Sequence, residues 1–436
     1  MTASWLYLAV AVWGSLFTLV SFRPPHRPGL FMAIGFFAAW LTTELAIVHL
    51  VLQIVFTVVF IWFGALSAWP GWVALALTIV SWCGLVVAIR QANGTDNVFA
   101  SALAEAFGIH DAQARIERRR IWLPFWFRRR GVERIKNLSY VEDTTRRRHR
   151  CDIYRPKGGT TGAPVLLQIH GGAWVISNKD QQAMPLVNLM AARGWVCVSI
   201  NYGLSPRITW PEHLVNCKLA LAWIREHIVE YGGDPSFVAV TGGSAGGHLT
   251  AMMGLTANDP QWQPGFADTD TSVQAIIPFY GVYDWTASAT KRDRDLRRLL
   301  ERSVVKQPFA EAHAIYEAAS PMNHVGADAP PALVIHGSLD TLVPVTEARA
   351  FVAALRAVSN QPVAYAELRG AHHGFDVFNS IRSLHTIAAV DLFLTWLVNA
   401  DRSRAGVQSP PAADPIRSDE EDASATDPRS KVRTEP

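Results

Sequence analysis

The sequence predicts an α/β fold: a mostly parallel sheet of eight strands with helices on both faces, preceded by a helical region that spans a membrane. Two observations carry this prediction. Residues 1–90 are almost free of charge, whereas residues 134–399 alternate short β-branched runs with helical periodicity. Continuous apolar strands between helices are typical of parallel sheets that are covered on both faces. In such sheets, functional sites lie at the carboxyl ends of the strands.

Changes in composition predict four segments. Residues 1–90 form a transmembrane helical region with about three spans, and residues 91–133 form an amphipathic, basic linker or cap. Residues 134–399 form the α/β domain, and residues 400–436, rich in Pro, Ser, Asp, Glu and Arg, are expected to be disordered. The formal net charge of +3 over 436 residues is too small to argue for nucleic acid as a partner.

The cysteines give no indication of a metal or a cofactor. Cys83, Cys151, Cys197 and Cys217 show no C-x-x-C spacing, and a chain of this size does not need disulfide bonds to hold its core. We expect them to be small apolar residues of the interior. The predicted chemistry uses no cofactor and no metal.

Three apolar runs lie in residues 1–90. The first, 4–22, is long enough to cross about 30 Å of hydrocarbon as a helix. A signal peptide is the alternative, but no Lys or Arg precedes this run and no A-x-A site follows it. The second, 30–68, would reach about 60 Å as one helix, so we expect it to bend or split near residues 42–44. The third, 72–89, follows a Trp-Pro-Gly turn.

Arginines set the expected orientation of these spans. The connector 23–28 is basic, and so is the chain after the third run, with Arg90 and the triplets 118–120, 128–130 and 146–148. If both regions are cytoplasmic, residues 30–68 make one net crossing. This gives three spans in the cell membrane and a cytoplasmic α/β domain, whereas four spans would place that domain outside.

Glu44 and His49 are ionisable residues inside the apolar zone. Such residues within a membrane are functional candidates. The alternative is a position at a helix break near the lipid headgroups, which requires no function.

Residues 101–135 combine aromatic and basic side chains, as in the run Ile-Trp-Leu-Pro-Phe-Trp-Phe at 121–127 followed by three arginines. This composition favours contact with the membrane surface, with rings at headgroup level and cations on anionic lipid. A helix over 101–127 that caps the next domain is the alternative, and both readings are compatible.

Eight strands are expected in the α/β domain, at 132–140, 151–155, 165–170, 196–202, 237–241, 275–279, 332–336 and 363–367. Helices are expected after most of them, at 181–193, 211–231, 245–255, 346–358 and 381–400. A further charged helix, 291–301, lies in the long segment 280–330, which we expect to cover the pocket.

Ser244 lies between a predicted strand and a predicted helix, within the run Gly-Gly-Ser-Ala-Gly-Gly at 242–247. Flanking glycines allow the very sharp turn that exposes a serine hydroxyl at the top of a sheet. The same turn directs the first amides of the helix toward an oxygen beside that hydroxyl. The alternative is a tight turn with an incidental serine, because a lone G-x-S-x-G motif is weak evidence.

Three further features support a nucleophilic serine. Small residues follow a strand at Gly171, Gly172 and Ala173, where amides can bind an oxygen that becomes negative during acyl transfer. Asp340 follows a later strand, and the pair His372 and His373 follows the last one. The order of oxyanion loop, Ser, Asp and His, each at the carboxyl end of a strand, predicts a catalytic triad.

Residues 134–399 resemble the hormone-sensitive-lipase-like esterases of the α/β-hydrolase fold, and the whole chain resembles membrane-anchored lipases and esterases of actinobacteria. The resemblance rests on HGGAW at 170–174, NYGLSP at 201–206, GGSAGG at 242–247, HGSLDTLVP at 336–344 and HHGF at 372–375. It implies that Gly172, Ala173 and Ala245 donate to the oxyanion, with Gly171 beside them. It also favours His373 over His372. Many members carry Asp where this chain has Gly243, and many carry Arg where it has Gly203.

The expected activity is hydrolysis of carboxylic esters with apolar acyl groups, through an acyl-enzyme on Ser244 with His373 as base and Asp340 as its partner. The expected partners are a small ester or lipid substrate and membrane lipid. An acyltransferase with the same triad, a serine peptidase and a catalytically silent module that binds lipid or a protein partner are the alternatives.

Overall fold

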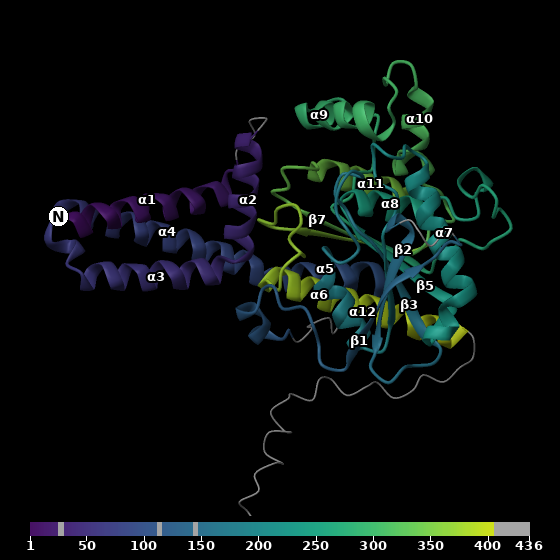
Figure 1. Ribbon diagram of the computed structural model, residues 1–436, viewed down its shortest axis with the longest axis horizontal. Helices are drawn as coiled ribbons and strands as arrows, with labels where there is room; N and C mark the ends of the chain where they lie inside the picture. The colour runs from purple at the N-terminus through teal and green to yellow at the C-terminus, as the bar shows by residue number, and fades with distance from the viewer. Residues whose placement is uncertain (25–29, 111–115, 143–146, 405–436) are drawn as a thin grey trace, which may run out of the picture. The chain divides into compact units, whose positions relative to one another are not determined.

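The computed structural model describes residues 1–24, 30–110, 116–142 and 147–404 (Figure 1). Most of the basic connector 23–28 lies outside these residues, as do Arg146 and the part of the predicted tail beyond residue 404.

Eight strands form one sheet in the order β1-β2-β4-β3-β5-β6-β7-β8. Strand β2 is antiparallel to both of its neighbours, β1 and β4. The remaining six strands, β4, β3, β5, β6, β7 and β8, are parallel to one another. The prediction of a mostly parallel sheet of eight strands is confirmed. The strands are β1 (Val132–Ser139), β2 (Arg150–Pro156), β3 (Ala163–Ile169), β4 (Val196–Ile200), β5 (Gly233–Gly243), β6 (Ala275–Phe279), β7 (Ala332–Gly337) and β8 (Val363–Leu368).

Helices pack on both faces of this sheet (Figure 1). Helix α6 packs on β2 and β4, α8 on β5 and β6, and α11 on β7 and β8. The last helix continues to Arg404, beyond the predicted end at residue 400. The helices are α6 (Met184–Ala192), α7 (Glu212–His227), α8 (Ala245–Leu255), α9 (Lys291–Leu299), α10 (His313–Ala318), α11 (Val345–Val358) and α12 (Ile381–Arg404).

The core lies between the central strands and these helices. Every residue of β4 and β6 is buried, because both faces of the sheet are covered. Cys151, Cys197 and Cys217 lie in this interior, and burial raises the pKa of the Cys151 thiol to about 12. Cys83 is the exposed cysteine.

The N-terminal region consists of α1 (Thr2–Phe22), α2 (Leu30–Glu44), α3 (Ala46–Trp62), α4 (Trp69–Asn93) and α5 (Thr95–Phe107). Helices α2 and α3 meet at a bend of 89° directly after Glu44, so the predicted break near residues 42–44 is confirmed. Polar side chains join the helices from within: Tyr7 donates to Thr57 at 3.3 Å and to Thr78 at 3.2 Å.

By length and composition, three helical stretches among the described residues are able to cross a membrane, or four if the bent pair counts as one span. Two of them, Thr2–Phe22 and Trp69–Phe107, lie in the N-terminal region, and the third is α12. Leu384, Ile387 and Val390 of α12 are buried. These residues make α12 a core helix of the α/β domain.

The predicted helix over 101–127 is wrong. Helix α5 ends at Phe107 because Gly108 adopts a left-handed conformation with φ of 67°. It packs against β8, and Phe107 lies 4.8 Å from Phe393 between ring centroids. The aromatic run beyond it holds only a short 3-10 helix at Arg118–Trp122.

Candidate active site

Ser244 occupies the turn between β5 and α8. Its backbone has φ of 60° and ψ of −120°, a conformation that costs energy for a residue with a side chain and that persists only where the surroundings enforce it. The Ser244 amide donates to Phe279 O at 3.0 Å, which ties the turn to the end of β6. Strained residues of this kind cluster at functional sites.

Two glycines allow the chain to crowd this serine. A Cβ atom on Gly171 would lie 3.0 Å from Ser244 Cβ and 2.4 Å from Gly243 O, so the loop after β3 lies directly against Ser244. A Cβ atom on Gly243 would lie 2.7 Å from the hydroxyl of Tyr280. A side chain at Gly171 would require the backbone to move, and one at Gly243 would require the Tyr280 side chain to move.

The loop after β3 presents amides next to Ser244. Gly172, Ala173 and Trp174 follow one another with φ values of 105°, 54° and 59°. Among the described residues, no protein acceptor receives the N–H groups of Gly172, Ala173 or Ala245. The Gly171 amide, by contrast, donates to Gln182 Oε1 at 2.7 Å. Of the four predicted oxyanion donors, the Gly171 amide therefore already has an acceptor. The amides of the other three residues stay candidates for binding the oxyanion.

Asp340 and His373 are joined directly. His373 Nδ1 donates to Asp340 Oδ2 at 2.7 Å, although 33 residues separate them in the sequence. The other carboxylate oxygen accepts the amides of Leu342 and Val343, each at 2.8 Å. Burial alone would raise the pKa of Asp340, but the charge of His373 and the hydrogen bonds from His336 and His373 outweigh it and hold that pKa well below its usual range.

The two adjacent histidines differ in their partners. Nε2 of His372 is hydrogen-bonded to Ser21 O at 2.9 Å, and burial lowers the pKa of His372. His373 is the one that contacts the acid. The choice of His373 over His372 as the base stays a prediction, and the hydrogen bond to Asp340 supports it.

Tyr280 contacts His373 and lies beside Gly243, the neighbour of Ser244 in the chain. The Tyr280 ring centroid lies 4.5 Å from that of His373, and its hydroxyl lies against Gly243, which precedes Ser244. No hydrogen bond joins the Ser244 hydroxyl to His373 within the described part of the chain. Such bonds are often long before substrate arrives and tighten in the reacting complex.

Sequence reasoning missed the second carboxylate beside the histidine. Tyr280 donates a hydrogen bond to Asp376 Oδ1, and Asp376, three residues after His373, is buried. Burial raises the pKa of Asp376. Because 96 residues separate Tyr280 from Asp376, no local pattern indicates their contact.

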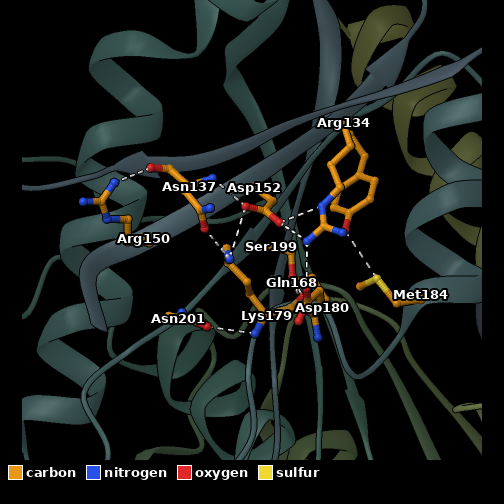
Figure 2. Close-up of polar contacts among 11 residues, drawn as sticks. Arg134, Asn137, Arg150, Asp152, Gln168, Lys179, Asp180, Met184, Ser199 and Asn201 are labelled. Carbon is orange, nitrogen blue, oxygen red and sulfur yellow. Dashed lines mark hydrogen bonds and ion pairs between the residues drawn. The ribbon is translucent and has the colours of Figure 1, made fainter. Parts of the chain in front are cut away.

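A network of polar side chains surrounds Asp152 on β2 (Figure 2). Asp152 is fully buried; its Oδ1 accepts Asn137 N at 2.7 Å and its Oδ2 accepts Arg134 Nε at 2.8 Å, while Lys179 Nζ lies 3.3 Å from Oδ1. The Lys179 amide donates to Asn201 Oδ1 at 2.8 Å. Lys179 is thereby fixed three residues before Gln182, the acceptor of the Gly171 amide.

A cavity of about 740 Å³ borders the loop that carries Asp340. It is lined by the end of α1, with Phe22 and Arg23, and by Arg292 of α9. Arg292 donates to the backbone oxygen of Asp340 at 3.2 Å. Among the described residues, no group of three or more His, Cys, Asp or Glu side chains is placed to hold a metal ion.

Comparison with known proteins supports this fold and an esterase family. Residues 151–355 match the family BD-FAE. The chain is 41% identical to the esterase LipQ of Mycobacterium tuberculosis, over 74% of this chain and 80% of LipQ. It is 54% identical to the probable carboxylic ester hydrolase LipM of the same organism, over 59% of this chain and 60% of LipM.

Solved structures share the fold. A truncated carbohydrate esterase from gut microbiota aligns over 61% of this chain and 96% of its own length, with a TM-score of 0.53 and 24% identity. Esterase B from Lactobacillus rhamnosis aligns over 72% of this chain and 99% of its own length, with a TM-score of 0.55 and 16% identity. At these identities the likeness establishes the fold alone. From its sequence relatives, its fold and the matching motifs, the chain belongs to the hormone-sensitive-lipase-like carboxylic ester hydrolases of the α/β-hydrolase fold.

Proposed function

We propose that this chain hydrolyses carboxylic esters of apolar acids with a triad of Ser244, His373 and Asp340. The observation that carries the proposal is the strained turn at Ser244, with the loop Gly171–Ala173 packed against it and the hydrogen-bonded pair of Asp340 and His373 nearby. The catalytic machinery of an ester hydrolase requires these components in one place.

In this mechanism, His373 Nε2 takes the Ser244 proton as Oγ attacks the ester carbonyl carbon. Asp340 holds the proton on Nδ1 and stabilises the imidazolium that forms. The amides of Gly172, Ala173 and Ala245 bind the oxyanion, and His373 then donates its proton to the leaving alcohol. Water, activated by the same imidazole, releases the acid from the acyl-enzyme.

The test is turnover of a short p-nitrophenyl ester by Ser244→Ala. We expect kcat to fall at least about 10³-fold, because the covalent route is lost, and a fluorophosphonate probe should label the wild type but not the variant. Undiminished turnover would end the proposal. Added acceptor alcohols distinguish transfer from hydrolysis, since an acyltransferase would yield a new ester in place of the free acid.

An apolar acyl preference is supported by the surroundings of the oxyanion loop. Trp174 follows Ala173 directly and packs edge-on against Trp285 at 5.0 Å and against His248 at 5.1 Å. Trp210 adds a third indole to the same cluster.

We further propose that the N-terminal helices anchor the enzyme in the cell membrane with its α/β domain on the cytoplasmic side. Large apolar side chains on these helices are exposed, among them Trp13 at 65%, Val58 at 60% and Val80 at 69%. In a membrane, lipid would cover these side chains, so that their apolar surface would not be exposed to water. Trp122, Phe125 and Trp126 are also more than half exposed beside arginines 128–130, which favours contact with anionic headgroups.

A further inference from the structure

The loop that carries His373 is held by side chains and backbone of the N-terminal helices. Trp40 of α2 donates from Nε1 to Gly374 O at 2.9 Å, at the residue that follows His373. On the other side, His372 is bonded to Ser21 O of α1. The Trp40 ring also packs on Phe378, further along the loop, with centroids 4.6 Å apart.

Glu44 holds the far end of the same loop. It is buried at the bend between α2 and α3, and it accepts Ser380 Oγ at 2.7 Å and a hydrogen bond from Arg382 Nη1. Ser380 Oγ in turn accepts the Ser383 amide at 3.0 Å, at the start of α12.

Arg382 connects this contact to the beginning of the loop. The Arg382 side chain is fully buried, and its Nη2 donates to Arg369 O at 3.3 Å, directly after β8. Residues 369 and 382 are thus tied together across the loop, with Glu44 as the carboxylate that compensates the guanidinium. Removing one partner of a buried ion pair leaves an uncompensated charge and is strongly destabilising, so we expect loss of the Glu44 carboxylate to disturb the loop that Arg382 closes.

We propose that Glu44, with Trp40, is a positioning residue for His373, so that the membrane helices set the place of the catalytic base. This inference rests on the proposed function, because it assigns a role in relation to that base. Reacting groups tolerate little displacement, and a misplacement of about 1 Å can cost about 100-fold in rate.

The test compares Glu44→Gln and Trp40→Phe with Tyr7→Phe in full-length protein in detergent micelles. Glu44→Gln keeps the acceptor for Ser380 and removes the charge opposite Arg382, and Trp40→Phe removes the donor to Gly374 O but keeps an aromatic ring beside Phe378. Tyr7→Phe is the matched control, because it removes hydrogen bonds inside the N-terminal helices that do not involve the loop. We expect kcat to fall about 10- to 100-fold in Glu44→Gln and less in Trp40→Phe, with KM within about two-fold and the control unchanged.

A double-mutant cycle separates positioning from general damage. If Glu44 acts through His373, Glu44→Gln lowers the residual rate of His373→Ala no further. A multiplied loss in the double variant, or an equal loss in Tyr7→Phe, would overturn the inference. Full activity of His373→Ala would instead overturn the proposed triad, so the two failures are distinguishable.

Discussion

At Gly243, the residue before Ser244, Tyr280 occupies the space that a side chain would need. Many members of the family carry Asp at this position. Here a buried carboxylate is present as well, but it is Asp376, which comes from the histidine loop and accepts the Tyr280 hydroxyl. The sequence shows that residue 243 is Gly and not Asp. It does not show that Asp376 lies nearby, because the contact between Tyr280 and Asp376 depends on the packing of distant segments.

His248, one turn after Ser244, predicts a measurable pH dependence of stability. It is fully buried, its Nε2 is hydrogen-bonded to Ala319 O at 2.8 Å, and burial lowers its pKa from 6.5 to about 3. The unfolded chain binds this proton near pH 6.5, whereas the folded chain binds it only near pH 3. The contribution of His248 is therefore fully present above pH 6.5 and is lost progressively as the pH falls toward 3.

We expect this residue alone to lower the free energy of unfolding by about 2 kcal/mol between pH 7.5 and pH 5. His248→Gln keeps a donor nitrogen but does not titrate, so its stability should fall less over the same interval. Denaturant unfolding of the detergent-solubilised proteins at both pH values measures the difference. Equal losses in the two proteins would show that His248 does not contribute in this way.

At the scale of elements, the strands follow closely from the sequence, because alternation of apolar runs with helices is a local signal. Residues 275–279 and 245–255 are found as predicted, as β6 and α8. The supports of the site were not predictable in the same way. Gln182 and Lys179 act through hydrogen bonds to other segments, and nothing in their local sequence distinguishes them from surface residues.

Gln182 is expected to matter for the oxyanion loop. Gln182→Ala removes the acceptor of the Gly171 amide. Gly171 is then no longer held in place next to residues 172–174, whose φ values are positive. We expect kcat for a p-nitrophenyl ester to fall about ten-fold with little change in KM, since each well-placed oxyanion donor contributes in the transition state. Gln261→Ala, at an exposed glutamine, is the control. If both variants keep wild-type kcat, the loop does not depend on Gln182.

At the scale of the whole molecule, composition alone separated the N-terminal helices from the α/β domain and located the bend after Glu44. It did not reveal that the two regions share a buried ion pair, because Glu44 and Arg382 are 338 residues apart in the chain. The same distance hid the hydrogen bond between Trp40 and Gly374, 334 residues apart. Hydropathy indicates whether a segment favours lipid or water, but not which residues of the protein it contacts.

Membrane anchoring predicts how the full-length protein fractionates. We expect it to stay in the membrane pellet after an alkaline carbonate wash and to enter solution only with detergent, because the exposed apolar faces of the helices require lipid or its substitute. The variant Trp122→Ala/Trp126→Ala should behave the same, since it alters only the interfacial segment. Release of the wild type by carbonate would contradict an integral anchor.

The distribution of the four thiols leaves one cysteine, Cys83, accessible to a labelling reagent in the native chain. Cys83 is exposed on α4, while Cys151, Cys197 and Cys217 are buried in the α/β domain. A maleimide that dissolves in lipid would meet Cys83 first, and a water-soluble one would be kept from it wherever α4 is immersed. A spin label or fluorophore can therefore be attached to this helix without engineering a new cysteine.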